Sequence, residues 1–245
     1  MGYYNYQNGL IFRHLNQEGG WDDHLRQSRQ LILKAIDLYK PRKISVLGSG
    51  WLLEMPLAEI INRVEKICLV DIVHPPAVID QTAGIKNIEL VYEDLTGGLI
   101  EEVWNKAHKY SFLKKVKSLE SINIKEYVPE TDPGMVISLN VLTQLESLII
   151  DFMRKRTRIP DDELNTFKKM IQKNHIDFLM RHNSVLVSDI SEIITSKSGT
   201  VTEIPTLMTE PPQFKYRQEW IWNFDPHGDD YYNKRSKFKV IGLII

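Results

Sequence analysis

The sequence predicts an α/β fold built around a mainly parallel sheet. Strand-sized apolar runs alternate with segments of helical periodicity, which is typical of strands joined by helices. The first of these strands ends in a glycine-containing turn, Gly48-Ser49-Gly50. The last two apolar runs are separated by one short turn-rich segment, so we expect them to pair antiparallel. With 245 residues, 42% of them hydrophobic, the chain can fill a core.

The first half of the chain alternates between helices and strands. Apolar residues on one face predict a helix over Asp22 to Tyr39, and Pro41 follows its end. Two further helices are expected, over about Leu52 to Val64 and after His74-Pro75-Pro76, and Pro56 falls early in the first of them. The expected strands are Ile44 to Leu47, Lys66 to Asp71 and Ile88 to Tyr92.

The middle of the chain continues this alternation with one long insertion. A helix begins near Gly97-Gly98, and the segment from Lys106 to Pro133 is too long for an ordinary loop, so we expect a helix of its own there. The fourth strand is Met135 to Leu139. A helix over Pro160 to about Arg181 opens with proline and three acidic residues, as helices prefer, and the fifth strand is Ser184 to Ile190.

The C-terminal part completes a seven-stranded sheet. A polar, proline-containing stretch from Ser191 to Gln213 precedes two strands, Glu219 to Phe224 and Lys237 to Ile244, which form the terminal hairpin. We therefore expect one domain over 1–245, with an N-terminal helical cap over 1–42 and a core over 43–245. The expected insertions are near 106–133 and 191–213.

Composition disfavours several classes of protein. The formal net charge is −1, with no basic excess of the kind that extensive nucleic-acid binding requires. The single cysteine, Cys68, excludes an intramolecular disulfide and is expected to be buried as a small hydrophobe. No apolar run is long enough for a membrane span, and no secretory signal is visible. We expect a cytoplasmic protein without a membrane partner, and we predict no metal site.

Three places at the carboxyl ends of the first three strands carry the functional signal. The turn Gly48-Ser49-Gly50 lets a ligand approach the backbone closely, although it also fits a purely structural turn. Asp71 ends the second strand, where a carboxylate can accept hydrogen bonds from both hydroxyls of a ribose. Asp94 follows the third strand and can accept a hydrogen bond from an adenine amino group, flanked by Leu95. Capping the next helix is the alternative role for either acid.

This order of motifs resembles the class I S-adenosylmethionine-dependent methyltransferases. The resemblance rests on Val46-Leu47-Gly48-Ser49-Gly50, Leu69-Val70-Asp71, Tyr92-Glu93-Asp94 and the fourth strand with its end, Val136 to Leu142. It spans roughly Lys43 to Ile245 and implies a three-layer Rossmann-like fold, with a reversed last strand inserted beside the fifth. It also implies S-adenosylmethionine as cofactor.

The resemblance assigns roles to residues at the strand ends. The first loop contacts the methionine part, the second acid holds the ribose, the third touches adenine, and the fourth strand ends at the site of methyl transfer. The cofactor-binding residues it implies are Gly48, Ser49, Gly50, Trp51, Glu54, Asp71, Ile72, Asp94, Leu95, Asn140 and Val141. Asn140 is also the candidate catalytic residue, as a polar group near the transferred methyl, with a role in stabilising its loop as the alternative.

The sequence departs from the family pattern at two positions in the first loop. Many members have an acid where Val46 stands and a glycine where Leu52 stands. Glu54, or Arg26 in the N-terminal helix, is a candidate substitute for gripping the methionine amino group. The fourth strand lacks the Asn/Asp-Pro-Pro-Tyr/Phe motif of the methylases that act on adenine or glutamine amino groups, which disfavours those acceptors.

The sequence supports methyl transfer to an unidentified acceptor, either a small molecule or a protein. Alignment supplies most of the acceleration of such a transfer, so no catalytic triad is expected. We expect the N-terminal segment and both insertions to cover the acceptor pocket. One alternative is a nicotinamide-dependent oxidoreductase, which Leu53 disfavours because it replaces the third glycine of that fingerprint. Another is a protein that binds the cofactor without transferring its methyl group. The sequence does not predict the oligomeric state.

Overall fold

The structure, a computed structural model, describes residues 1–108, 119, 122–229 and 234–245. The strands are β1 (Lys43–Leu47), β2 (Lys66–Asp71), β3 (Ile88–Tyr92), β4 (Met135–Leu139), β5 (Ser184–Thr195), β6 (Val201–Pro205), β7 (Tyr216–Asp225) and β8 (Arg235–Ile244). The helices are α1 (Tyr3–Asn16), α2 (Asp22–Tyr39), α3 (Leu57–Ile60), α4 (Pro76–Thr82), α5 (Leu99–His108), α6 (Ser147–Arg156) and α7 (Asp161–Leu179).

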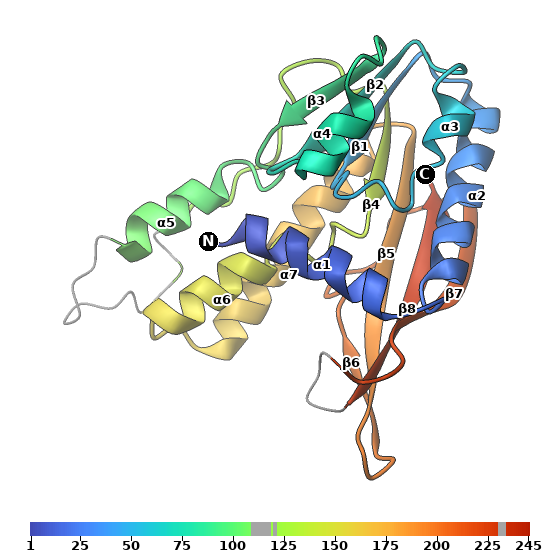
Figure 1. Ribbon diagram of the computed structural model, residues 1–245. Coiled ribbons are helices and arrows are strands. Elements are labelled where there is room, and N and C mark those ends of the chain that lie inside the picture. The colour runs from blue at the N-terminus through green and yellow to red at the C-terminus, as the bar shows by residue number, and fades with distance from the viewer. Residues whose placement is uncertain (109–118, 120–121, 230–233) are drawn as a thin grey trace.

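Within the described residues these strands form one eight-stranded sheet, shown in Figure 1. Its order is β3-β2-β1-β4-β5-β8-β7, and β6 pairs with the outer half of β5. Strands β1 to β5 run parallel to their neighbours in this row, whereas β8 is antiparallel to both β5 and β7. The predicted α/β class, the mainly parallel sheet and the antiparallel C-terminal hairpin are therefore confirmed. The last strand lies beside the fifth, as the resemblance implied.

Two apolar cores cover the two faces of the sheet. Successive side chains of a strand point to opposite faces, so Ile44 and Val46 of β1 join one core and Leu47 joins the other. The first core packs the sheet against α2, α3 and α4, and the second packs it against α5, α6 and α7. This gives three layers, and it leaves the carboxyl ends of the parallel strands free to carry a site. Cys68 is buried in the second core, as predicted.

The helix predicted after β1 is mostly wrong. A helix is expected from about Leu52 to Val64, but only the four residues of α3 are helical. Leu52 has a φ of 59°, in the left-handed region that no right-handed helix includes, and Pro56 stands at the N-cap. The chain from Trp51 to Pro56 therefore forms an irregular loop, which brings its side chains to the end of the sheet.

The predicted second insertion is also partly wrong. β5 continues to Thr195 rather than ending at Ile190, and β6 returns antiparallel to it. The polar stretch after Ser191 thus contributes an eighth strand to the sheet, and all five residues of this strand, β6, are exposed. In the first predicted insertion, near 106–133, residues 122–133 contain no helix. Residues 109–118 and 120–121 lie outside the described residues.

Two helices were not specified by the sequence pattern. α6 follows the loop after β4, and α1 precedes α2. Figure 1 shows α1 crossing the end of the sheet where β1 and β4 terminate, on the same side as the loops that follow these strands. α1 has no completely buried side chain, so the sequence shows no apolar stripe that would predict this helix. The helix covers the site, and we call it the roof.

Candidate functional site

One cavity lies at the carboxyl ends of β1, β2 and β4, beneath α1. It is a partly open cavity, with about 970 Å³ of space between its lining atoms when the open solvent is included. All eleven residues predicted to bind the cofactor line it: Gly48, Ser49, Gly50, Trp51, Glu54, Asp71, Ile72, Asp94, Leu95, Asn140 and Val141. The structure therefore brings the predicted residues together, while their roles stay predictions.

The glycine turn shapes the floor of this cavity. Gly48 has a φ of 70° and Gly50 a φ of 48°, values that glycine adopts without strain. A Cβ on Gly48 would lie 2.7 Å from Cβ of Val141, so only glycine lets the β1 and β4 loops approach so closely. Leu52 also has a positive φ, at the position where the resembling family has its third glycine. Leu52 therefore adopts a backbone conformation that glycine would favour, and its side chain is buried.

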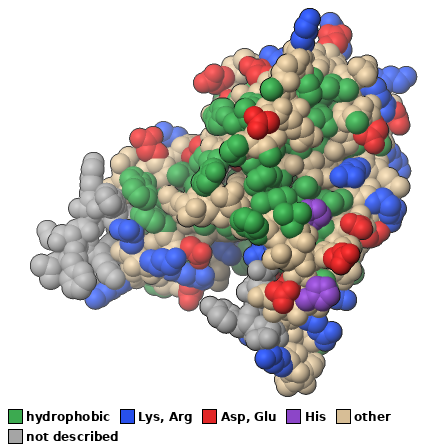
Figure 2. All heavy atoms as spheres, viewed as in Figure 1, with side chains coloured by type: hydrophobic (Ala, Val, Ile, Leu, Met, Phe, Trp, Pro, Cys, Tyr) green, Lys and Arg blue, Asp and Glu red, His purple; other side chains and the backbone are tan. Residues whose placement is uncertain are grey.

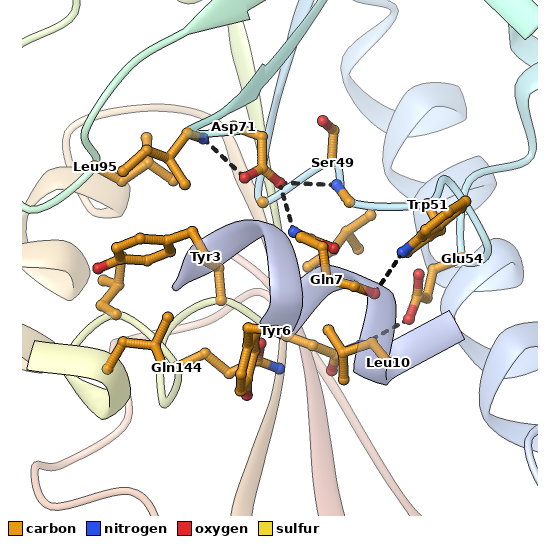
Figure 3. A pocket seen from close by; sticks show the side chains of 18 of the residues that line it. Tyr3, Tyr6, Gln7, Leu10, Ser49, Trp51, Glu54, Asp71, Leu95 and Gln144 are labelled. Atoms are coloured by element: carbon orange, nitrogen blue, oxygen red, sulfur yellow. Dashed lines mark hydrogen bonds between the residues drawn. The ribbon is translucent and has the colours of Figure 1, made fainter. Parts of the chain in front are cut away.

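Asp71 is fixed at the end of β2 by backbone donors. Its Oδ1 accepts a hydrogen bond from Ile72 N at 2.8 Å, and its Oδ2 accepts one from Gly50 N at 2.9 Å. Burial raises the pKa of Asp71 more than these hydrogen bonds lower it. Figure 3 shows that Oδ2 also faces Gln7 of α1, which donates across 3.5 Å. The carboxylate thus joins the glycine turn to the roof of the cavity.

Asp94 caps the start of α5, the role that the sequence offered as an alternative to ligand binding, and it also lines the cavity. Its Oδ1 accepts hydrogen bonds from Thr96 N at 2.9 Å and from Thr96 Oγ1 at 2.5 Å. Its Oδ2 accepts a longer bond of 3.3 Å from Ile100 N, in the first turn of α5. Because Oδ2 has this single long bond, it keeps a lone pair for a ligand donor.

Glu54 and Asn140 meet at the opposite end of the cavity from Asp94. Asn140 Nδ2 donates to Glu54 Oε1 at 3.0 Å, and Asn140 itself has a φ of 51°, which asparagine tolerates better than most residues. Burial raises the pKa of Glu54, but hydrogen bonds from His24 and Asn140 outweigh it and hold this pKa below its ordinary value. Glu54 is therefore an anion at neutral pH. Among the described residues it forms no ion pair with lysine or arginine.

His24 supports Glu54 and is fixed in one tautomer. The indole N–H of Trp220 donates to His24 Nδ1 at 3.1 Å, so in the neutral ring the proton sits on Nε2. Nε2 lies 3.6 Å from Glu54 Oε1 and 3.0 Å from Asn140 Nδ2. Two donors cannot bond each other, so we assign the Nε2 proton to Glu54.

The roof residues were missed by the sequence analysis. Tyr3, Tyr6, Gln7 and Leu10 of α1 all line the cavity. Their spacing of three, four and seven residues places them on one face of a helix. Because two of the four are tyrosines and one is glutamine, the stripe is too polar to stand out as a core-facing pattern. Trp222 of β7 was missed for another reason, since only the position of the hairpin beside β5 brings it to the site.

Unpartnered polar atoms mark the cavity as a place for a polar ligand. Buried polar groups almost always have hydrogen-bond partners. Five residues that line this cavity nevertheless carry a buried polar atom without one: Tyr3 Oη, Gln7 Oε1, Ser49 Oγ, Asn140 Oδ1 and Trp222 Nε1. These atoms offer both donors and acceptors, so a bound molecule with mixed polar groups could satisfy them.

Other candidates lie away from the cavity. Arg26 is on the outer surface of α2, paired with Asp23, and does not line the site. It therefore cannot replace Glu54 as a grip on a ligand. No group of metal-binding side chains occurs among the described residues, and no helix in that part of the chain could span a membrane.

Comparisons with known proteins name no family for the chain. No family model matches it. An uncharacterized protein of Acanthamoeba polyphaga mimivirus is 27% identical over 126 residues, which cover 45% of this chain and 70% of that protein. Among solved structures, the methyltransferase domain of bacterial CtHen1 aligns with 89% of this chain and 99% of that one, at 12% identity and a TM-score of 0.33. The fold assignment above therefore rests on the strand order of this chain.

Proposed function

We propose that this chain binds S-adenosylmethionine in the cavity beneath α1 and transfers its methyl group to an acceptor. The observation that carries the proposal is the distribution of acids along one cavity. Asp71 and Asp94 lie at one end, suited to a ribose and a nucleobase, and the anionic Glu54 lies at the other, where no lysine or arginine among the described residues pairs with it. A nucleoside joined to an amino acid has hydroxyls for the first end and an ammonium for the second.

The residues present fit this cofactor. Ser49 Oγ, Asn140 Oδ1 and Trp222 Nε1, which are buried without partners, need donors or acceptors that a nucleoside and an amino acid both carry. The glycine turn leaves room for close approach of the ligand to the backbone. The strand order, with β8 between β5 and β7, also agrees with the resemblance to methyltransferases. The residues of the site do not specify the methyl acceptor.

Chemical catalysis in such a site depends on positioning. The cofactor supplies a methyl group that is already activated on a sulfonium, so alignment contributes most of the acceleration, up to about 7–11 kcal/mol. Glu54 holds the ammonium group and cannot at the same time serve as a free base. Asn140 Oδ1 has no partner, which supports our assignment of this atom as the acceptor of a hydrogen bond from an N–H or O–H of the methyl acceptor. This contact would turn the nucleophilic lone pair toward the methyl group.

Thermal shift measurements test the proposal against its rival. S-adenosylmethionine should raise the unfolding temperature of the wild type, and NADH should not, because Leu53 stands where a nicotinamide site needs glycine. Asp71→Asn should abolish most of the shift. Stabilisation by NADH alone would favour the oxidoreductase and contradict the proposal. Stabilisation by S-adenosylmethionine, with no methyl-labelled product formed in any small-molecule or protein fraction, would mean that the chain binds the cofactor without transferring its methyl group.

A further inference from the structure

The side chain of Gln7 occupies a ligand position on Asp71. Its Nε2 lies 3.5 Å from Asp71 Oδ2, and the remaining partners of that carboxylate are backbone N–H groups. Gln7 packs directly on the glycine turn, since a Cβ on Gly50 would lie 3.7 Å from Gln7 Oε1. Figure 3 shows the carboxamide between α1 and Asp71, inside the cavity. A ribose hydroxyl that donates to Oδ2 would need the same space.

A second residue of α1, Tyr3, lies near Asp94, the other acid at the nucleoside end of the cavity. Tyr3 lines the cavity with Asp94, and its hydroxyl is buried without a partner. Burial, and then the charge of Asp94, raise the pKa of Tyr3 above its ordinary value. The phenol therefore stays protonated while it lies next to the acid that we assign to the nucleobase. Gln7 and Tyr3 are one turn apart on the inner face of α1, so both move with that helix.

α1 is attached to the rest of the chain in a way that permits movement. It contains no fully buried residue, and its N-terminus has no side-chain cap. Its C-terminal end leads through Gly19 and Gly20 to Trp21, which is buried against α2 and β7. Two hydrogen bonds join Gln7 of α1 to residues around the glycine turn, one from Gln7 Nε2 to Asp71 and one of 2.8 Å from Trp51 Nε1 to Gln7 O, and the Arg13 guanidinium lies 4.7 Å from the centre of the Phe224 ring. Figure 2 shows hydrophobic side chains near the centre of the face on which α1 lies, and Tyr4, Phe12 and Leu15 of α1 are among those exposed.

We propose that α1 is an internal competitor for the nucleoside end of the cavity. In the free protein the Gln7 carboxamide takes the hydrogen bond on Asp71 that a ribose hydroxyl takes in the complex, and Tyr3 fills the place next to Asp94. A nucleoside binds only when Gln7 withdraws, so the measured affinity is lower than that of an open site. The assignment of the ligand rests on the proposed function, whereas the Gln7–Asp71 contact does not.

Calorimetric titration with adenosine and with S-adenosylhomocysteine tests the competition. Gln7→Ala should bind both ligands about 3- to 10-fold more tightly than the wild type, as expected for removal of one long hydrogen bond to a charged group. Asn5→Ala is the matched control, because it removes an amide from the exposed face of the same helix and should leave both affinities unchanged. Weaker binding by Gln7→Ala would make Gln7 a ligand of the nucleoside and overturn the proposal, as would unchanged binding.

Hydrogen exchange without any ligand gives a second readout. Amides of residues 3–16 should exchange faster in Gln7→Ala than in the wild type, and Asn5→Ala should not differ from it. Equal rates in all three proteins would show that Gln7 does not hold α1 in place and would overturn the proposal. If neither ligand binds any of the three proteins, the proposed function fails with it. If the wild type binds both ligands and Gln7→Ala binds them no more tightly, only the competition fails.

Discussion

At the scale of single residues, the main finding is that acids far apart in the sequence line one cavity in distinct environments. Asp71 is held by backbone donors, Asp94 caps the turn before α5, and Glu54 is bonded by Asn140 and His24. The sequence could predict the first two because each follows a strand of a parallel sheet. It could not assign the environment of Glu54, because His24 and Asn140 are 116 residues apart along the chain.

Glu54→Gln should separate the two halves of the ligand. The variant keeps the shape of the side chain and removes its charge, so an ammonium group loses its partner. S-adenosylhomocysteine should bind about 10-fold or more weakly than to the wild type, and 5′-methylthioadenosine, which has no amino-acid part, should bind equally to both. Calorimetry measures both affinities. An equal loss for the two ligands would mean that Glu54 supports the fold of the site rather than the ammonium.

The affinity for adenosine should depend on pH through Asp71. Burial raises the pKa of Asp71 above its ordinary value, so its charge is lost at a higher pH than that of an exposed aspartate. A neutral carboxyl is a weaker acceptor, and binding should therefore weaken as the pH falls from neutrality toward that raised pKa. Titrations at several pH values measure the effect, with Asp71→Asn as the reference of constant side-chain charge. Parallel pH profiles for both proteins would exclude Asp71 as the cause.

At the scale of elements, the strands could be predicted well and the helices less so. Four parallel strands, β2, β3, β4 and the start of β5, begin or end at the expected residues; β2, β4 and the start of β5 are buried and are nearly continuous apolar runs, whereas β3 at the sheet edge is partly exposed. The helix after β1 could not be excluded, since the apolar residues there suit a helix, although the positive φ of Leu52 and Pro56 at the N-cap leave only Leu57–Ile60 helical. α1 was missed because it covers a cavity and buries no side chain completely.

The contact between the β1 and β4 loops can be tested with two glycines of the same turn. Gly48→Ala and Gly50→Ala both place alanine at a positive φ, which costs about 1–2 kcal/mol. Only Gly48 also meets Val141, at 2.7 Å, which adds about 1–3 kcal/mol of overpacking. Equilibrium urea unfolding should therefore show the larger loss for Gly48→Ala. Equal losses would mean that the two loops separate easily and that the close approach does not define the site.

At the scale of the whole molecule, a polar cluster between the sheet and α7 should make stability depend on pH. Glu146 is 1% exposed, and burial raises its pKa to about 8. Its Oε1 accepts a hydrogen bond from Gln172 Nε2 at 3.1 Å, and its Oε2 has no partner. An acid whose pKa is raised in the folded state binds its proton more tightly there than in the unfolded chain. The free energy of unfolding should therefore fall as the pH rises from about 4.5 to about 8.

Glu146→Gln should remove this dependence. At pH 7 the variant should be more stable than the wild type by about 3 kcal/mol at most, because its folding requires no proton uptake at this position and its amide oxygen can keep the bond to Gln172. The two proteins should have similar stability near the ordinary pKa of glutamate. Urea unfolding across this pH range measures the difference, and Asp162→Asn, an exposed acid on α7, is the control. A variant that is less stable at every pH would show that Glu146 is charged and stabilising.

The arrangement of the whole molecule also explains why the acceptor could not be predicted. The nucleoside end is built from successive strand ends, whose order is visible in the sequence. The other end combines Leu10 of α1, Glu54 of the loop after β1 and Trp222 of the terminal hairpin, which only the three-dimensional structure brings together. Residues 109–118 and 120–121 of the predicted insertion over 106–133 lie outside the described residues, so its role as a cover stays a prediction.

The central claim is that a glycine turn, two acids at one end and a carboxylate at the other form a single binding site for a nucleoside joined to an amino acid. Titration of S-adenosylmethionine into the wild-type protein in a calorimeter tests it most directly. We predict saturable binding to one site per chain, strongly weakened in Asp71→Asn. A flat titration for the wild type, in protein shown to be folded, would contradict the account.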